Sequence, residues 1–195
     1  MPTRIAILGG PRCGKTTLIQ QLYVDMKIRD LNVGVATEYS TDYLRDKGMI
    51  ETIAEQYGIY LGQAQLEESL NEFDYALTDY ATFVPYIYGR FMLGDKKRTR
   101  KEIEILKDLY ILALRDLPKY HHIFFVPREF GYTQDGVRWQ DEELASAIDK
   151  AILSFLEAEN VKFEIITGST KERSKKILDI VGLSNIEIKA AMPQK

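Results

Sequence analysis

Five short and nearly unbroken apolar runs occur along the chain, and longer segments with a helical spacing of apolar residues lie between them. A strand that is covered on both faces, as in a parallel sheet, is apolar at almost every position rather than at every second one. The predicted strands are therefore residues 4–8, 33–37, 75–78, 123–126 and 163–166.

Five helices are predicted between and after these strands. In the third of them, Ile103, Leu106 and Leu109 share one stripe, which is the spacing of an amphipathic helix. The last helix opens with a capping box at Ser169 and ends near Gly182. The predicted helices cover residues 16–30, 63–73, 101–116, 141–158 and 169–182.

The alternation of strands and helices predicts a doubly wound α/β sheet, because right-handed crossovers place helices on both of its faces. The chain has 195 residues, of which 45% are hydrophobic, enough to bury a core without a disulfide or a metal. No repeat, low-complexity tract or linker divides it. We therefore predict a single domain over residues 1–195, with about the last ten residues loosely held.

Charge and cysteine content narrow the class of protein. Lys and Arg number 26 against 29 Asp and Glu, for a formal net charge of -3, which argues against a general nucleic-acid binder. Cys13 is the one cysteine, so no intramolecular disulfide can form and a reducing compartment is expected. The first apolar run is too short for a signal peptide, and no stretch reaches the roughly 20 apolar residues of a membrane span. These properties predict a soluble, cytoplasmic protein.

The first predicted strand and helix are joined by a glycine-rich loop, GGPRCGKT, which fits the pattern G-x-x-x-x-G-K-[ST]. Strand, loop and helix follow one another in the order that this phosphate-binding motif requires. The loop N–H groups and the positive helix end bind phosphates, Lys15 supplies a cation to the β- and γ-phosphates, and the Thr16 hydroxyl holds Mg²⁺. The predicted nucleotide-binding residues are Gly9, Gly10, Pro11, Arg12, Cys13, Gly14, Lys15, Thr16 and Thr17.

A carboxylate at the end of the third predicted strand is the second candidate Mg²⁺ ligand. Asp79 follows the apolar run, and we favour it over Asp74 at the beginning of the strand. The alternative is that Asp79 only ends the strand. The chain contains no Asn-Lys-x-Asp sequence for reading guanine, so ATP is the expected donor.

Glu38 lies where the second predicted strand ends, and ligands of open α/β sheets bind at the carboxyl ends of strands. Its carboxylate can hydrogen-bond a substrate hydroxyl or accept its proton. We expect Glu38 to serve the acceptor and not ATP, because a further carboxylate beside the triphosphate would repel it. A solvated strand end is the alternative.

Residues 127–141 follow the fourth predicted strand and are too long and too polar for a plain connection. They include Arg128 and Arg138, whose planar guanidinium groups can each bind two phosphate oxygens, and glycines that suit hinges. We predict a short lid that closes over the transferring phosphates. An ordinary surface loop with its arginines in salt bridges is the alternative.

Three further features have two interpretations each. Gly168 and Ser169 follow the fifth predicted strand, where the backbone can meet an adenine base or simply cap a helix. Residues 95–101 are basic and fit either an anionic acceptor or a solvated helix start. Four side chains have the spacing of either a base-binding face or a packed helix face: Tyr57, Tyr60, Gln63 and Gln65.

In the order of these motifs the chain resembles P-loop kinases of the nicotinamide-riboside-kinase-like ATPase group, including small phage-type members, and more distantly deoxynucleoside and nucleoside monophosphate kinases. The resembling segments are residues 9–17, 37–39, 77–80, 128 with 135–138, and 165–169. The resemblance implies a three-layer P-loop NTPase fold, a five-stranded parallel sheet in the order 2-3-1-4-5, Mg-ATP as donor and a small hydroxyl or phosphate acceptor. Deoxynucleoside kinases usually have Asp-Arg after the third strand, whereas here Tyr80 follows Asp79.

The leading hypothesis is a kinase that transfers the γ-phosphoryl group of ATP to a nucleoside-like or nucleotide acceptor. Its predicted catalytic residues are Lys15, Glu38, Arg128 and Arg138. Two alternatives stay open: a kinase for a hydroxyl of a nucleic acid, and a regulatory nucleotide-binding ATPase without a small-molecule acceptor. A homodimer is also open, because kinases of this build often dimerise.

Overall fold

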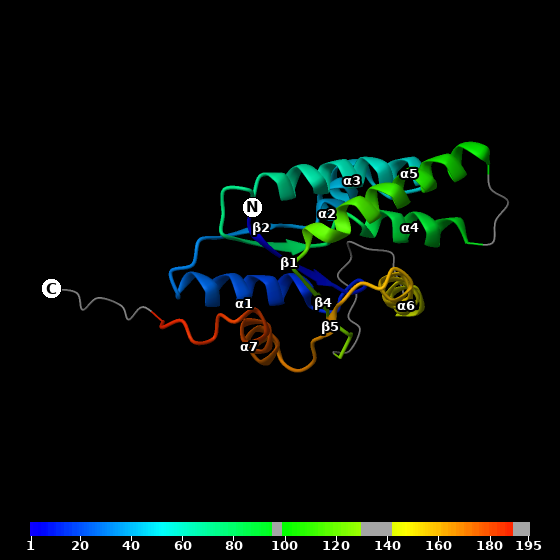
Figure 1. Ribbon diagram of the computed structural model, residues 1–195. Helices are drawn as coiled ribbons and strands as arrows, with labels where there is room; N and C mark the ends of the chain where they lie inside the picture. Colours follow the sequence, from blue (N-terminus) through cyan, green and yellow to red (C-terminus); the bar gives the residue numbers. More distant parts are fainter. Residues whose placement is uncertain (95–98, 130–141, 189–195) are drawn as a thin grey trace.

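The computed structural model describes residues 1–94, 99–129 and 142–188 (Figure 1). Its centre is a five-stranded sheet in the order β2-β3-β1-β4-β5, in which every neighbouring pair of strands is parallel. This order and direction confirm the predicted fold class. The strands are β1 (Thr3–Leu8), β2 (Val33–Ala36), β3 (Tyr75–Asp79), β4 (His122–Phe125) and β5 (Glu164–Ile165).

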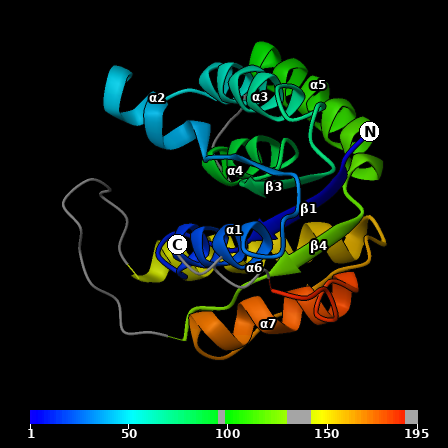
Figure 2. The same ribbon diagram turned by 90° about the vertical axis from the view of Figure 1, so that its left-hand side faces the viewer.

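Helices cover both faces of the sheet and give the molecule three layers. They are α1 (Lys15–Lys27), α2 (Tyr39–Lys47), α3 (Ile53–Glu68), α4 (Val84–Leu93), α5 (Arg100–Asp116), α6 (Glu142–Ala158) and α7 (Thr170–Val181), with a short 3-10 turn at Leu117–Lys119. Figures 1 and 2 show α3, α4 and α5 on one side of the sheet and α1 with α7 on the other.

Successive residues of β1 bury their side chains in two different cores, as expected for a strand covered on both faces. Ile5 and Ile7 pack against α1 and α7. Ala6 and Leu8 belong to the second core, which includes residues of α3, α4, α5 and α6. The unbroken apolar pattern of the strand therefore has a direct structural cause.

The register of the strands brings four chain segments to one edge of the sheet. Ile7 of β1 is paired with Asp79 of β3, and Ala36 of β2 is paired with Thr78. Leu8 of β1 is paired with Phe125 of β4. Because parallel strands all end at the same edge, the segments that follow β1, β2, β3 and β4 are neighbours there.

The structure corrects the predicted helices. The segment predicted as a helix over 63–73 is α3, which begins at Ile53 because Thr52 and Glu55 form a capping box. This helix ends at Glu68 and is followed by turns. Helices α2 and α4 were not predicted. Residue 141, the predicted start of α6, lies outside the described residues.

Within the ranges that the structure describes, no helix is both long enough and apolar enough to cross a membrane.

Candidate functional site

The glycine-rich loop joins the end of β1 to the start of α1, and its backbone needs glycine at two positions. Gly9 has a φ of +148°, and a Cβ there would lie 2.6 Å from both the Cys13 sulfur and the Val126 carbonyl oxygen. Gly14, which precedes α1, has a left-handed φ of +87°. Glycine is therefore required at these positions by close packing against Val126, directly after β4, and by backbone conformation.

Lys15 begins α1 and is buried, with 7% of its surface exposed. Its ammonium donates a hydrogen bond to the Gly10 carbonyl oxygen at 2.9 Å. Burial opposes its charge, but neighbouring acidic groups outweigh burial and raise the pKa of Lys15. The groups that raise it are, in decreasing order, Cys13, Glu38, Asp79 and Tyr88. Lys15 is therefore a permanent cation at the centre of the site.

Thr16 and Asp79 meet directly, although 63 positions separate them in the chain. The Thr16 hydroxyl donates to a carboxylate oxygen of Asp79 at 2.6 Å. Asp79 is 2% exposed and ends β3. A hydroxyl and a carboxylate are the hard oxygen ligands that Mg²⁺ prefers, so the two residues fit the predicted metal.

Glu38 is the N-cap residue of α2, and its carboxylate accepts a hydrogen bond from the Ser40 hydroxyl at 2.6 Å. The next residue fixes this position. Tyr39 donates its backbone N–H to Gln63 of α3 at 3.0 Å, and its ring lies so close to Gly62 that a Cβ there would be 2.2 Å from it. Helix α3 thus holds the start of α2 at the sheet edge. The charge of Glu38 reaches Lys15, as its effect on the lysine pKa shows.

Arg128 follows β4 and forms an ion pair of 2.7 Å with Asp149 of α6. The other Asp149 oxygen accepts a hydrogen bond from the Gly10 N–H, so Arg128 is held beside the glycine-rich loop. Arg138 and most of the predicted lid at 127–141 lie outside the described residues.

Sequence reasoning missed Arg173, the largest fully buried side chain. From α7 it donates to the Cys13 carbonyl oxygen at 3.1 Å and to the Glu129 carboxylate at 2.6 Å. Glu129 in turn accepts from the Gly168 N–H at 2.7 Å. Arg173 therefore ties the glycine-rich loop to the segments that follow β4 and β5. Its position four residues before the buried Ile177, on one helix face, was the available signal.

The structure distinguishes between the two interpretations for some of the ambiguous sequence features. The Ser169 side chain accepts from the Glu172 N–H, so this serine caps α7. Tyr60 and Gln63 are buried at 3% and 0% exposure, which fits the packing interpretation of the α3 face. Residues 95–98 of the basic run lie outside the described residues.

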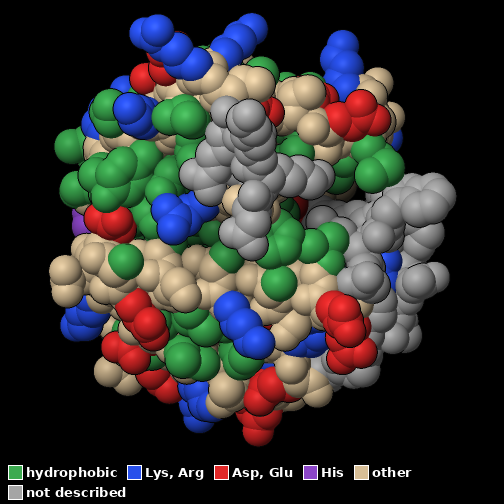
Figure 3. Space-filling model, turned by 90° about the vertical axis from the view of Figure 1, so that its right-hand side faces the viewer, with side chains coloured by type: hydrophobic (Ala, Val, Ile, Leu, Met, Phe, Trp, Pro, Cys, Tyr) green, Lys and Arg blue, Asp and Glu red, His purple; other side chains and the backbone are tan. Residues whose placement is uncertain are grey.

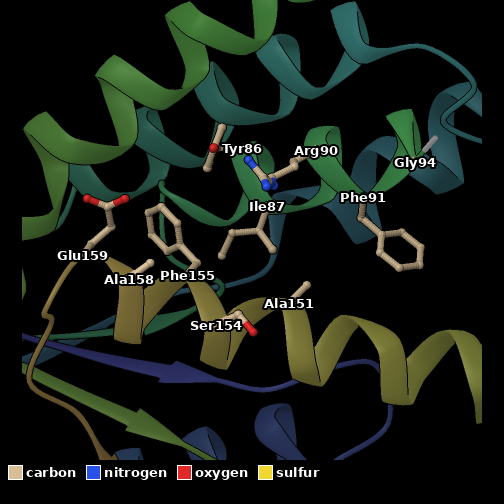
Figure 4. Close-up of a pocket in the computed structure, with 10 residues that line it drawn as sticks. All are labelled: Tyr86, Ile87, Arg90, Phe91, Gly94, Ala151, Ser154, Phe155, Ala158 and Glu159. Carbon is tan, nitrogen blue, oxygen red and sulfur yellow. The ribbon is translucent and has the colours of Figure 1, made fainter. Parts of the chain in front are cut away.

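A cavity of about 520 Å³ lies between α4 and α6 (Figure 4), and no residue of the glycine-rich loop lines it. Its lining residues are Tyr86, Ile87, Arg90, Phe91, Gly94, Ala151, Ser154, Phe155, Ala158 and Glu159. In the space-filling view, hydrophobic side chains gather across the middle of one face, between charged side chains (Figure 3). This cavity is thus separate from the phosphate-binding residues.

Comparison with known proteins places the chain in a family. The AAA domain family matches residues 4–173. Among curated proteins, no sequence matches this chain. The solved structures that share its fold include two of NadR and one of a thymidylate kinase. One NadR structure is in complex with NR; it is 16% identical in sequence, has a TM-score of 0.72, and the match covers 98% of this chain and 53% of NadR. The other NadR structure is in complex with NAD and AMP-PNP; it is 15% identical, has a TM-score of 0.73, and the match covers 98% of this chain and 52% of NadR. The third structure is thymidylate kinase from Candida albicans; it is 12% identical in sequence, has a TM-score of 0.63, and the match covers 93% of this chain and 91% of the kinase.

This chain spans about half the length of the NadR chains, whereas it is comparable in extent to the thymidylate kinase. The family match over residues 4–173 includes the glycine-rich loop and strands β2 to β5. The chain belongs to the AAA domain family and has the fold of the P-loop kinases.

Proposed function

We propose that this protein is an ATP-dependent kinase that transfers the γ-phosphoryl group of Mg-ATP to a nucleoside-like or nucleotide acceptor. The observation that carries the proposal is the placement of two carboxylates around Lys15. Asp79 is hydrogen-bonded to Thr16, and Glu38 lies at the end of β2, with its charge acting on the same lysine. In this proposal the Asp79 carboxylate binds the metal and the Glu38 carboxylate binds the acceptor.

On the donor side, the Lys15 ammonium moves from the Gly10 carbonyl oxygen to the β- and γ-phosphate oxygens. Its raised pKa keeps it charged while it does so. Thr16 and Asp79 would hold Mg²⁺, which when bound neutralises charge on the phosphates. The N–H groups at the start of α1 add the positive end of the helix dipole.

On the acceptor side, Glu38 aligns the acceptor hydroxyl and takes its proton. The acceptor oxygen forms a bond to the γ-phosphorus, and the bond between that phosphorus and the β–γ bridging oxygen breaks. ADP leaves with the bridging oxygen, and the proton rests on Glu38. Ser40 restricts the carboxylate to one orientation, because its hydroxyl donates to Glu38 at 2.6 Å.

The similar structures support this assignment. The NadR structures contain NR in one case and NAD with AMP-PNP in the other, and the third structure is a thymidylate kinase described as having broad substrate specificity. A nucleoside-like or nucleotide acceptor and an ATP-like donor are therefore the first candidates for this chain.

The test is a transfer assay with labelled Mg-ATP against nucleosides, nucleoside monophosphates, nicotinamide riboside and short oligonucleotides. The control is the Lys15→Ala variant, which removes the cation without disturbing the sheet. Transfer to a small acceptor that depends on Lys15 supports the proposal. Transfer to oligonucleotides alone, with a steep dependence on salt, would identify a nucleic-acid kinase instead. ATP hydrolysis without transfer to any acceptor would contradict kinase activity.

A further inference from the structure

Gly10 is held through both of its backbone polar groups. Its carbonyl oxygen accepts a hydrogen bond from the Lys15 ammonium at 2.9 Å. Its N–H donates to a carboxylate oxygen of Asp149, on α6, at 2.5 Å. A Cβ on Gly10 would lie 2.6 Å from that oxygen and 2.8 Å from the Ala145 carbonyl oxygen, so the absence of a side chain lets α6 approach the loop. The position of Lys15 is thereby linked to α6.

The second carboxylate oxygen of Asp149 binds Arg128. The distance to its Nη2 atom is 2.7 Å, and the two side chains are only 10% and 18% exposed, with arginine the more buried. The Nε–H of Arg128 is buried and has no hydrogen-bond partner in the described part of the chain. The ion pair with Asp149 therefore engages only part of the hydrogen-bonding capacity of the guanidinium group.

Helix α6 is a rigid support for this carboxylate. Ile148 and Ile152, which flank Asp149 on the inner face of the helix, are each 1% exposed and belong to the core beneath α4. A side chain mounted on a packed helix is held more precisely than one on a loop. Asp149 can thus fix the position of whatever it binds.

We infer that Asp149 is a positioning residue that holds the glycine-rich loop and Arg128 in place from one carboxylate. It fixes the backbone of Gly10, whose carbonyl oxygen holds Lys15 until the ammonium moves to the phosphates, and it binds Arg128 directly. This inference rests on the proposed function, which assigns Lys15 to the phosphates, and on the prediction from the sequence that Arg128 binds them too. While the ion pair is intact, the arginine also neutralises a carboxylate that would otherwise repel a triphosphate beside the loop.

Two substitutions separate the two contacts. Asp149→Asn keeps an oxygen that can accept from the Gly10 N–H but loses the charge that binds Arg128. Asp149→Ala loses both contacts. Arg128→Ala and the double variant Asp149→Asn with Arg128→Ala complete a double-mutant cycle. Glu159→Gln is the matched control, because Glu159 directly follows α6 and its carboxylate accepts a hydrogen bond from a side chain of another helix, at 2.9 Å from the Tyr110 hydroxyl of α5.

The main measurement is the affinity for Mg-AMP-PNP, with kcat and the KM for ATP measured on any acceptor that the transfer assay identifies. We expect Asp149→Ala to weaken Mg-AMP-PNP binding about tenfold or more, and Asp149→Asn to weaken it clearly less. Once Arg128 is Ala, Asp149→Asn should produce no further loss of affinity or of kcat. Glu159→Gln should bind as the natural protein does.

Additive effects of Asp149→Asn and Arg128→Ala would overturn the inference, because a merely structural residue would act independently of Arg128. Unchanged binding by Asp149→Ala would also overturn it. The proposed function fails separately: if the natural protein binds Mg-AMP-PNP but transfers no phosphoryl group, kinase activity is refuted while the binding cycle still decides the role of Asp149. Failure of the natural protein to bind Mg-AMP-PNP would refute both.

Discussion

Glu67, near the end of α3, is a buried carboxylate that the proposed chemistry does not use, and it gives the fold a distinctive pH dependence. It is 3% exposed. The Tyr120 hydroxyl donates to its two oxygens at 3.0 and 2.9 Å, and Arg4 lies 3.6 Å away. Burial disfavours the charged form more than these partners and Gln63 favour it, which raises the pKa of Glu67 to about 7.

The sign of the effect follows from the two pKa values. In the unfolded chain Glu67 releases its proton near its ordinary value of 4.5, whereas in the folded protein it keeps it up to about 7. Between these values the folded state binds more protons, so the free energy of unfolding decreases as pH rises. At about 1.36 kcal/mol per pKa unit, the shift corresponds to a loss of about 3 kcal/mol between pH 4.5 and pH 7.

The perturbation is Glu67→Gln, which keeps the shape of the side chain and cannot titrate. The assay is urea unfolding from pH 4.5 to pH 8 for the natural protein, for Glu67→Gln and for Glu68→Gln, an exposed neighbour on the same helix. Relative to Glu67→Gln, the natural protein should lose about 3 kcal/mol across this range, and the comparison removes the titration of the two histidines. Glu68→Gln should follow the natural protein. A difference between the natural protein and Glu67→Gln that does not change with pH would refute the reasoning.

Three other predictions concern the site and its support. Lys15→Ala should lower phosphoryl transfer about a hundredfold or more while circular dichroism stays unchanged, and unchanged turnover would remove the loop from the chemistry. Glu38→Gln should leave ATP affinity nearly unaltered and lower transfer about a hundredfold, whereas lost ATP affinity with normal transfer at saturation would place Glu38 on the donor side. Arg173→Met should lower the free energy of unfolding by about 1–3 kcal/mol, because it leaves the Cys13 carbonyl oxygen without its buried donor and removes the ion pair with the exposed Glu129. The exposed Lys175→Met is the control in urea unfolding, and equal effects of the two substitutions would contradict the support assigned to Arg173.

The sheet could be predicted because each strand carries its own signal. An unbroken apolar run such as that of β1 has a single explanation when both faces are covered, and the structure confirms the parallel sheet and its order. Helix α4 was missed for the opposite reason. Its residues from Val84 to Ile87 are all buried, so the segment shows no polar face from which a helical period can be read.

The phosphate-binding loop could be located for a related reason, since its requirements are local. Gly9, Gly14 and Lys15 are specified by backbone conformation and by the start of one helix, all within a few residues. The role of Asp79 is harder to predict, because its contact with Thr16 depends on the pairing of β3 with β1. Its place at the end of an apolar strand was a sufficient signal only because strand ends share one edge of the sheet.

The contacts of Asp149 and Arg173 could not be predicted from the local sequence. Asp149 binds Gly10 across 139 positions of the chain, and Arg173 binds the Cys13 carbonyl across 160. In the sequence each is a charged residue in an amphipathic helix, for which a solvated position is the ordinary expectation. What makes them different is the absence of a side chain on Gly10 and the tight packing of Gly9 against Val126, directly after β4, which let the loop lie close to surrounding elements. Backbone polar groups at such short distances need partners, and the half-buried carboxylate of Asp149 and the buried guanidinium group of Arg173 supply several at once. The glycines of the loop therefore have a second role besides phosphate binding. They allow distant charged residues to approach the loop backbone and hold its conformation by hydrogen bonds.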